Sequence, residues 1–153
     1  MSNYFDQELL HDLREPLASG QLRVELQVDA YFDLMKGWFV IRNLRPHWSS
    51  LPFAVSEVEL DPQQQTQAFS AFFARMAHEY SLAGEAVYVG DSATSLAVLG
   101  DVSALLEVPD CLFSIPQHHY LLAADQGWFM CFTFEGEMGF GFLSGDLNQI
   151  SRR

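Results

Sequence analysis

Basic residues are scarce in this chain, and one long stretch has none. The 153 residues include 8 Lys and Arg against 20 Asp and Glu, which gives a formal net charge of −12. Residues 1–75 contain 10 acidic and 6 basic side chains, whereas residues 76–151 contain 10 acidic side chains and no Lys or Arg. A surface of this kind attracts cations and basic proteins and repels nucleic acid and anionic lipid. We therefore expect neither a nucleic acid nor a membrane as partner.

Cysteine and long apolar runs are also rare. Cys111 and Cys131 lie outside any CxxC motif among apolar neighbours, which is typical of buried free thiols, although a single disulfide stays open. No apolar run approaches the ~20 residues of a membrane span. The first residues lack the basic and apolar regions of a secretion signal. The cytoplasm is the compartment that we expect.

Common catalytic and metal-binding motifs are missing as well: GxSxG, the P-loop, GxGxxG, HExxH and the EF-hand pattern. His118 and His119 are adjacent, and in a strand they would point to opposite faces, so they would not bind one metal ion together. Cys111 has no basic neighbour that would lower the pKa of its thiol. We expect no cofactor, no metal and no catalytic residue.

The composition that is present predicts a folded domain. Hydrophobic residues make up 49% of the chain, aromatic residues 14% and charged residues 18%, the reverse of the balance in disordered chains. The length fits one domain. We expect a single α+β domain over residues 1–153, with residues 144–153 as a polar tail.

The clearest predicted element is an amphipathic helix over about residues 62–80. Asp61 is a good N-cap, and Pro62 suits the first helical position. Large apolar side chains then recur at the spacing of one helix face: Phe69, Phe72, Phe73, Met76 and Tyr80. We expect this helix to cover one face of a sheet.

The remaining patterns predict a short helix over residues 3–15 and a largely antiparallel sheet of about five or six strands. The expected strands are residues 21–31, 38–44, 86–89, 117–124, 127–135 and 137–143, and residues 54–60 are either a strand or the entry to the next helix. The last three form a meander, because only short turns separate them. Alternation places Trp128, Met130, Phe132 and Phe134 on one face of the central strand.

Carboxylates flank the turns of this meander. Asp125 follows its first strand, and Glu135 and Glu137 bracket the turn after its second strand. Asp91 and Asp110 are further candidates. Because connecting turns run over the surface, we expect these five residues to contact a partner. Successive turns of a meander lie at opposite ends of its strands, so one interface could include both only if the partner spans the strand length or the sheet curls.

The run PQHHYLLAADQGWFMCFTFEGEMGFGF over residues 116–142 resembles the C-terminal part of small bacterial immunity proteins of polymorphic or contact-dependent toxin systems. The resemblance implies a non-enzymatic protein that binds and neutralises a cognate toxin, often a nuclease with a basic cleft. The acidic charge suits such a basic partner. Two alternatives remain: an acidic adaptor or chaperone for a secreted protein, and a small enzyme that uses carboxylates and a histidine.

Overall fold

The computed structural model describes residues 3–38, 41–42, 45–46, 55–123 and 125–142. The helices are α1 (Tyr4–Asp12), α2 (Arg14–Ser19), α3 (Asp29–Trp38), α4 (Gln65–Glu79), α5 (Val102–Leu105) and α6 (Pro109–Phe113), and a 3₁₀ turn over Pro62–Gln64 precedes α4. The strands are β1 (Leu22–Glu25), β2 (Ile41–Arg42), β3 (Arg45–Pro46), β4 (Val55–Val58), β5 (Glu85–Gly90), β6 (Ala97–Asp101), β7 (His119–Ala123), β8 (Trp128–Phe132) and β9 (Glu137–Phe142). The predicted tail over residues 144–153 lies outside the described residues.

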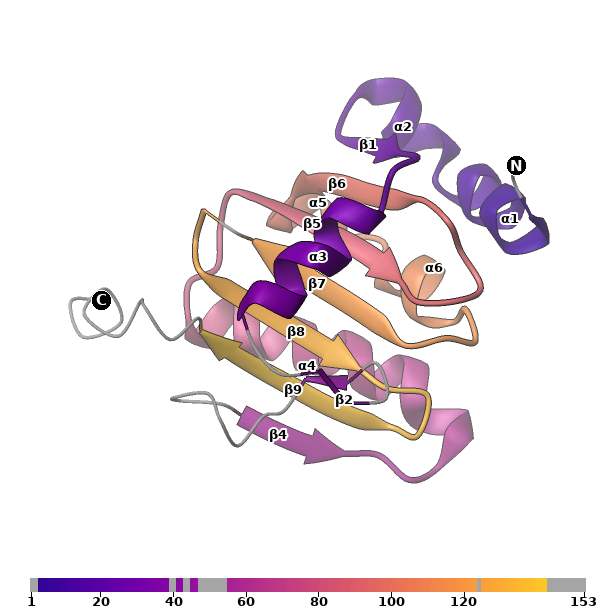
Figure 1. Ribbon diagram of the computed structural model, residues 1–153. Coiled ribbons are helices and arrows are strands. Elements are labelled where there is room, and N and C mark those ends of the chain that lie inside the picture. The colour runs from indigo at the N-terminus through magenta and orange to yellow at the C-terminus, as the bar shows by residue number, and fades with distance from the viewer. Residues whose placement is uncertain (1–2, 39–40, 43–44, 47–54, 124, 143–153) are drawn as a thin grey trace.

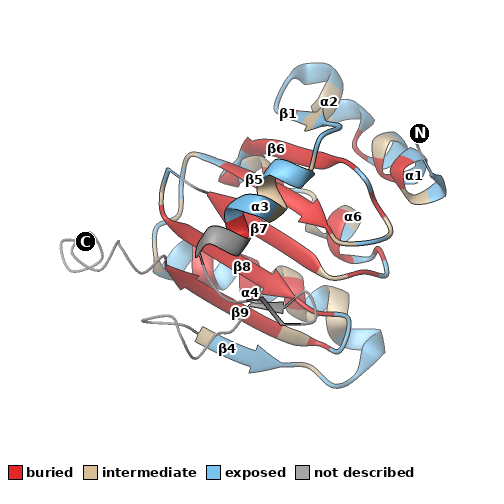
Figure 2. Ribbon diagram, in the orientation of Figure 1, coloured by how far each residue is buried: buried red, intermediate tan, exposed pale blue. Residues whose placement is uncertain are grey.

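The main sheet has seven strands in the order β1-β6-β5-β7-β8-β9-β4, and every described pair in it is antiparallel. The predicted α+β class and the C-terminal meander β7-β8-β9 are confirmed. The sheet is wider than the five or six strands expected, and β2 and β3 pair separately. β4 forms one edge, and three of its four residues are exposed (Figure 2).

Helices cover both faces of the sheet (Figure 1). α4 lies behind the sheet in this view together with α5 and α6, while α3 crosses the front. The larger core lies on the α4 side and contains Phe69, Phe72, Trp128, Phe132 and Phe140. The smaller core lies under α3 and contains Met35, Val87, Tyr120, Phe129 and Cys131. Because β8 is covered on both sides, its five residues are all buried.

The predicted helix over residues 62–80 is confirmed with a short 3₁₀ start. Asp61 caps it, since its Oδ1 accepts from the Gln63 backbone N–H at 3.0 Å. Phe69 stacks on Phe132 with ring centroids 4.9 Å apart, and Phe72 meets the same ring edge-on at 5.8 Å. The aromatic face of α4 therefore packs on β8, as the spacing predicts.

The prediction of one strand over residues 21–31 is wrong beyond Glu25. β1 ends there, and α3 begins at Asp29. Val28, Tyr31, Phe32 and Met35 all pack in the core under α3, and their spacing of three, four and seven residues is helical. The strand predicted over residues 38–44 is also wrong at its start, because Trp38 still belongs to α3 and β2 covers only Ile41–Arg42.

Phe134 departs from its predicted place in the apolar row of the meander. β8 ends at Phe132 and Thr133 is buried, but the Phe134 side chain is 60% exposed. The alternation of a strand ceases where the chain turns, so the sequence period does not apply to this residue.

A buried carboxylate attaches the N-terminal helix to the sheet. Asp6 is 1% exposed, and its oxygens accept from the Ser95 backbone N–H at 2.8 Å and the Ser95 hydroxyl at 2.5 Å. Asp6 also completes a capping box with Asn3 at the start of α1. In the described ranges, no helix is long and apolar enough to cross a membrane.

Candidate functional site

Three of the five carboxylates expected at an interface come to the same end of the sheet. Gly90 at the end of β5 pairs with His119 at the start of β7, and His119 pairs with Phe132 at the end of β8. Asp91 directly follows Gly90, and Glu135 and Glu137 follow Phe132 through the β8–β9 turn. This end lies at the right of Figure 1.

Two further carboxylates join this end from the segment between β4 and α4. The Glu59 backbone N–H donates to the Gly136 carbonyl at 2.9 Å, and Asp61 caps the turn that leads into α4. We call this surface the acidic end and define it as Glu59, Asp61, Asp91, Glu135 and Glu137. α4 contains one Lys or Arg, Arg75, whose guanidinium pairs with Glu57 and lies 5.4 Å from the Phe72 ring centroid.

The other two expected contact residues lie elsewhere. Asp125 follows β7 in the turn to β8, at the opposite end of the sheet from Glu135. Asp110 lies on α6, where its Oδ1 accepts from the Ser70 hydroxyl on α4 at 3.3 Å. The structure therefore does not bring all five residues to one end, in agreement with the meander geometry expected from the sequence.

The β8–β9 turn has one tightly determined shape. The Gly136 N–H donates to the Thr133 carbonyl at 2.9 Å, and the Thr133 N–H donates to the Glu137 carbonyl at the same distance. Gly136 has a φ of +95°, and a Cβ there would lie 2.0 Å from the Glu59 carbonyl oxygen. Only glycine fits this position, so the turn and the segment before α4 lie in backbone contact.

Phe134 lies in this turn and is exposed to solvent. Its backbone N–H donates to Nδ1 of His118 at 2.7 Å, while the His118 backbone N–H donates to Asp91 Oδ1 at 3.0 Å. The Phe134 backbone is therefore bonded to His118, which is itself bonded to Asp91, while Phe134 stays 60% exposed. An aromatic side chain that is exposed on a held backbone loses little conformational entropy on binding, which suits a contact residue.

A pocket of about 200 Å³ lies beside Phe134 on the α4 side of the sheet. Its lining is mainly apolar and includes side chains from α4, α6 and the β8–β9 turn: Pro62, Gln65, Thr66, Phe69, Phe113, Ser114, Ile115, Pro116, Gln117, His119, Thr133 and Phe134. The described lining contains no Asp or Glu. His119 is one of the lining residues, and 1% of its surface is exposed.

A chain of buried hydrogen bonds orients His119. Gln117 Oε1 accepts from the backbone N–H groups of Ser92, Ala93 and Thr94 at 3.3, 2.8 and 3.1 Å. Those donors identify the oxygen of the Gln117 amide, and its Nε2 then donates to Tyr88 Oη at 3.1 Å and to Thr94 Oγ1 at 2.9 Å.

Tyr88 connects Gln117 to His119, because its hydroxyl contacts both side chains. Tyr88 Oη lies 2.6 Å from His119 Nδ1 and 3.2 Å from the Leu112 carbonyl oxygen. Two arrangements fit these distances: Tyr88 donates to Nδ1 and Nε2 carries the ring proton, or Nδ1 carries that proton and donates to Tyr88, which then donates to the Leu112 carbonyl. Gly90 makes room for this arrangement, because a Cβ at that position would overlap the Gln117 amide at 2.0 Å.

Burial determines the protonation state of both His119 and Tyr88. Desolvation, with a smaller contribution from the charge of His118, lowers the pKa of His119 to about 3. Desolvation likewise raises the pKa of Tyr88 far above its usual value. At neutral pH both groups are uncharged and act as hydrogen-bonding groups.

The two cysteines lie on opposite sides of the sheet. Cys131 is buried under α3, and Cys111 is half-buried in α6, on the α4 side. Both are free thiols, and burial together with Asp12 and Asp110 raises the pKa of Cys111. A raised pKa is the opposite of what an activated nucleophile requires. In the part of the chain that the structure describes, no three His, Cys, Asp or Glu residues are grouped to hold a metal ion.

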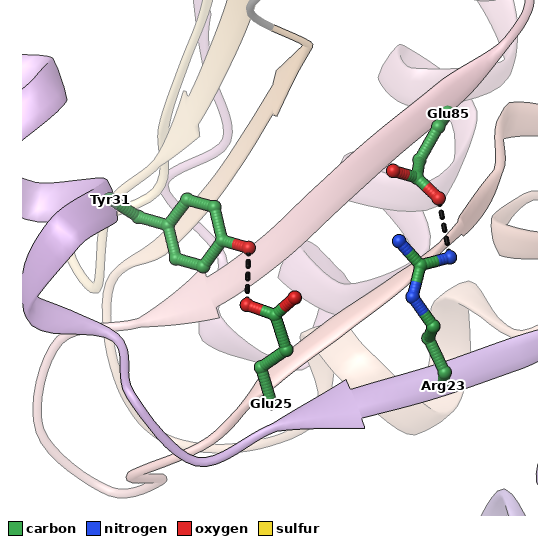
Figure 3. A network of polar contacts seen from close by, with 4 residues as sticks. All are labelled: Arg23, Glu25, Tyr31 and Glu85. Carbon is green, nitrogen blue, oxygen red and sulfur yellow. Dashed lines mark hydrogen bonds and ion pairs between the residues drawn. The ribbon is translucent and has the colours of Figure 1, made fainter.

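A second polar cluster lies on the α3 side of the sheet (Figure 3). Arg23 of β1 reaches Glu85 of β5 at 2.5 Å, and the Tyr31 hydroxyl of α3 donates to Glu25 at 2.6 Å. Both pairs line a shallow pocket of about 250 Å³, as does Asp125. These pairs connect the edge strand β1 to β5 and to α3.

Sequence reasoning missed Phe134 as a surface residue and missed the Gln117–Tyr88–His119 chain. The sequence does contain a signal for the first, since Phe134 directly precedes the Glu-Gly turn. It contains none for the second, because Tyr88 and His119 are 31 residues apart and meet only through the pairing of β5 with β7. No protein-family model, curated protein or solved structure matches this chain.

Proposed function

We propose that this chain is a non-enzymatic immunity protein that neutralises a basic toxin domain, and that the acidic end around Phe134 binds the toxin. The proposal rests on one exposed aromatic ring and five carboxylates at the same end of the sheet. Binding energy in protein interfaces concentrates in such aromatic anchors, and acidic rims speed association with basic partners.

The shape of the site supports a protein partner more than a chemical reaction. Phe134 is 60% exposed on a turn whose backbone is fixed by the His118 hydrogen bond and by the contact between Gly136 and Glu59. The nearby pocket has a histidine, but its pKa of about 3 makes it a weak base, and no described carboxylate lines that pocket. General acid–base catalysis near neutral pH works best with groups that have a pKa close to the working pH. The alternative of an enzyme with carboxylates and a histidine is therefore less well supported.

The partner is best sought in the product of the neighbouring gene. Co-expression of the two proteins should restore growth of cells that the partner alone inhibits. An adaptor or chaperone would instead raise the yield or secretion of its partner without relieving toxicity. Growth rescue and partner yield, measured in the same cultures, distinguish these two functions.

The site is tested by reversing charge at the β8–β9 turn. Glu135→Lys with Glu137→Lys changes the local charge by about +4 at pH 7, and we expect the affinity for the partner to fall at least tenfold, which is about 1.4 kcal/mol. Phe134→Ala should weaken binding to a similar extent, because it removes the aromatic anchor. Affinity is measured by calorimetry, after thermal melts have established that each variant folds.

A matched control carries the same charge change elsewhere. Glu79→Lys with Glu107→Lys replaces two exposed carboxylates, one at the end of α4 and one after α5. This variant should bind within about threefold of the unaltered protein, about 0.65 kcal/mol. Equal losses of affinity in the two double variants would mean that net charge alone drives binding. Full affinity in a folded Phe134→Ala protein would exclude the acidic end as the contact.

A further inference from the structure

The pocket beside Phe134 contains a buried histidine, and one of its two ring nitrogens makes no hydrogen bond within the part of the chain that the structure describes. His119 Nδ1 contacts Tyr88 Oη at 2.6 Å, so its Nε2 is the atom left for an interaction within the pocket that His119 lines. The ring is 1% exposed. A buried ring nitrogen gains from a hydrogen-bonding ligand, because leaving it unpaired costs free energy.

Aromatic rings surround this histidine. The Phe113 ring centroid lies 5.5 Å from that of His119, and the Phe69 centroid lies 6.1 Å away, both edge-on. Edge-on and offset arrangements are those that aromatic pairs prefer. The lining of the pocket therefore suits a ligand with a planar aromatic ring. Ile115 and Pro62 add apolar surface to the pocket.

The size of the pocket limits the ligand to one ring. Its volume of about 200 Å³ is below the range of roughly 300–1,000 Å³ that drug-sized ligands occupy. The ligand must also place a polar atom at the histidine. A hydroxyl meets this need for either form of the ring, since it accepts from a protonated Nε2 and donates to an unprotonated one, and Thr66 and Thr133 line the same pocket.

We propose that this pocket binds a phenol, with the aromatic ring beside Phe69 and Phe113 and the phenolic oxygen at His119 Nε2. The phenol has two sources: a free phenolic compound, or a tyrosine side chain of the partner. Only the tyrosine rests on the proposed function. Phe134 lines the pocket, and its neighbour Glu135 belongs to the acidic end, which favours a ring carried by a basic chain.

The test uses p-cresol as the probe and toluene as the matched control without a hydroxyl. In NMR titrations of the full chain, p-cresol should shift the ring signals of Phe69, Phe113 and His119 in a saturable way. It should bind at least tenfold more tightly than toluene, since a site built for a hydroxyl rejects the analogue that lacks it. Equal affinity for the two probes, or shifts confined to other residues, would overturn the proposal.

A blocking variant and a peptide complete the test. Ser114 is exposed and lines the pocket, so Ser114→Phe should abolish the p-cresol shifts while the protein stays folded; undiminished binding would contradict the assigned pocket. A blocked Lys-Tyr-Lys peptide that binds at least tenfold more tightly than p-cresol identifies the partner's tyrosine as the source. A peptide that binds less tightly identifies a free phenol, and this result leaves the proposed function to its own test.

Discussion

At the scale of single residues, buried polar side chains are oriented by hydrogen bonds between segments that are distant in the sequence. His119 is neutral because burial lowers its pKa to about 3, and it is oriented by Tyr88 and Gln117. Gly90 is required because the Gln117 amide occupies the space of its side chain. One histidine thus depends on residues from β5 and from the segment before β7.

The depressed pKa of His119 makes folding stability depend on pH. In the unfolded chain its pKa is about 6.5, so below that pH the unfolded state binds a proton that the native state does not. The free energy of unfolding should therefore fall as the pH drops from about 6.5 towards 3, by at most about 1.4 kcal/mol per pH unit from this group. Urea unfolding at pH 7, 5.5 and 4.5 measures the effect.

The control for this prediction is His119→Gln, which keeps a polar atom near Tyr88 and cannot titrate. Its loss of stability towards acid should be shallower than that of the unaltered protein, because only the carboxylates then contribute. NMR of the unaltered protein should show no titration of the His119 ring between pH 8 and 5. Parallel stability curves for the two proteins would mean that the histidine is not the cause.

At the scale of elements, α4 is the best example of a helix that its own periodicity specifies. Phe72 is 2% exposed, and it lies between α4 and Phe132 of β8. Phe72→Ala should lower the free energy of unfolding by roughly 3–5 kcal/mol, through lost burial and a cavity. Urea unfolding measures it, and Gln67→Ala, exposed on the same helix, should change stability by less than about 0.5 kcal/mol. Equal effects at the two positions would mean that the aromatic face of α4 does not pack on the sheet.

The β8–β9 turn shows how an element boundary changes the role of a residue. Phe132 is part of the core, and Phe134, two positions later, is exposed beside the pocket. The turn closes at Gly136, whose positive φ and contact with the Glu59 carbonyl leave no room for a side chain. The same alternation that buries Trp128, Met130 and Phe132 therefore stops at the surface where a partner can reach.

At the scale of the whole molecule, the proposed function predicts that charge controls how fast a basic partner associates. The net charge of −12 acts over the Debye length, which falls from roughly 10–15 Å near 0.05 M salt to about 4 Å near 0.5 M. Raising the salt over this range should slow association with a basic partner at least tenfold and change dissociation much less. Stopped-flow mixing measures both rates. An association rate that is independent of salt would remove electrostatic steering from the proposed function.

The sequence by itself determined the α+β class, the helix with its aromatic face and the antiparallel meander, because these depend on local periodicity and short turns. It also determined the acidic character of residues 76–151. It did not determine α3, whose helical spacing follows directly on the alternation of β1, so two periods compete for the same residues.

Only the tertiary structure decided which residues form the site. Asp91 and Glu135 are 44 positions apart in number, and they reach one end of the sheet because β5, β7 and β8 are paired in that register. The same pairing brings Tyr88 to His119 and places the pocket beside Phe134. Strand order depends on contacts between distant segments, and one sequence contains no local pattern that specifies it.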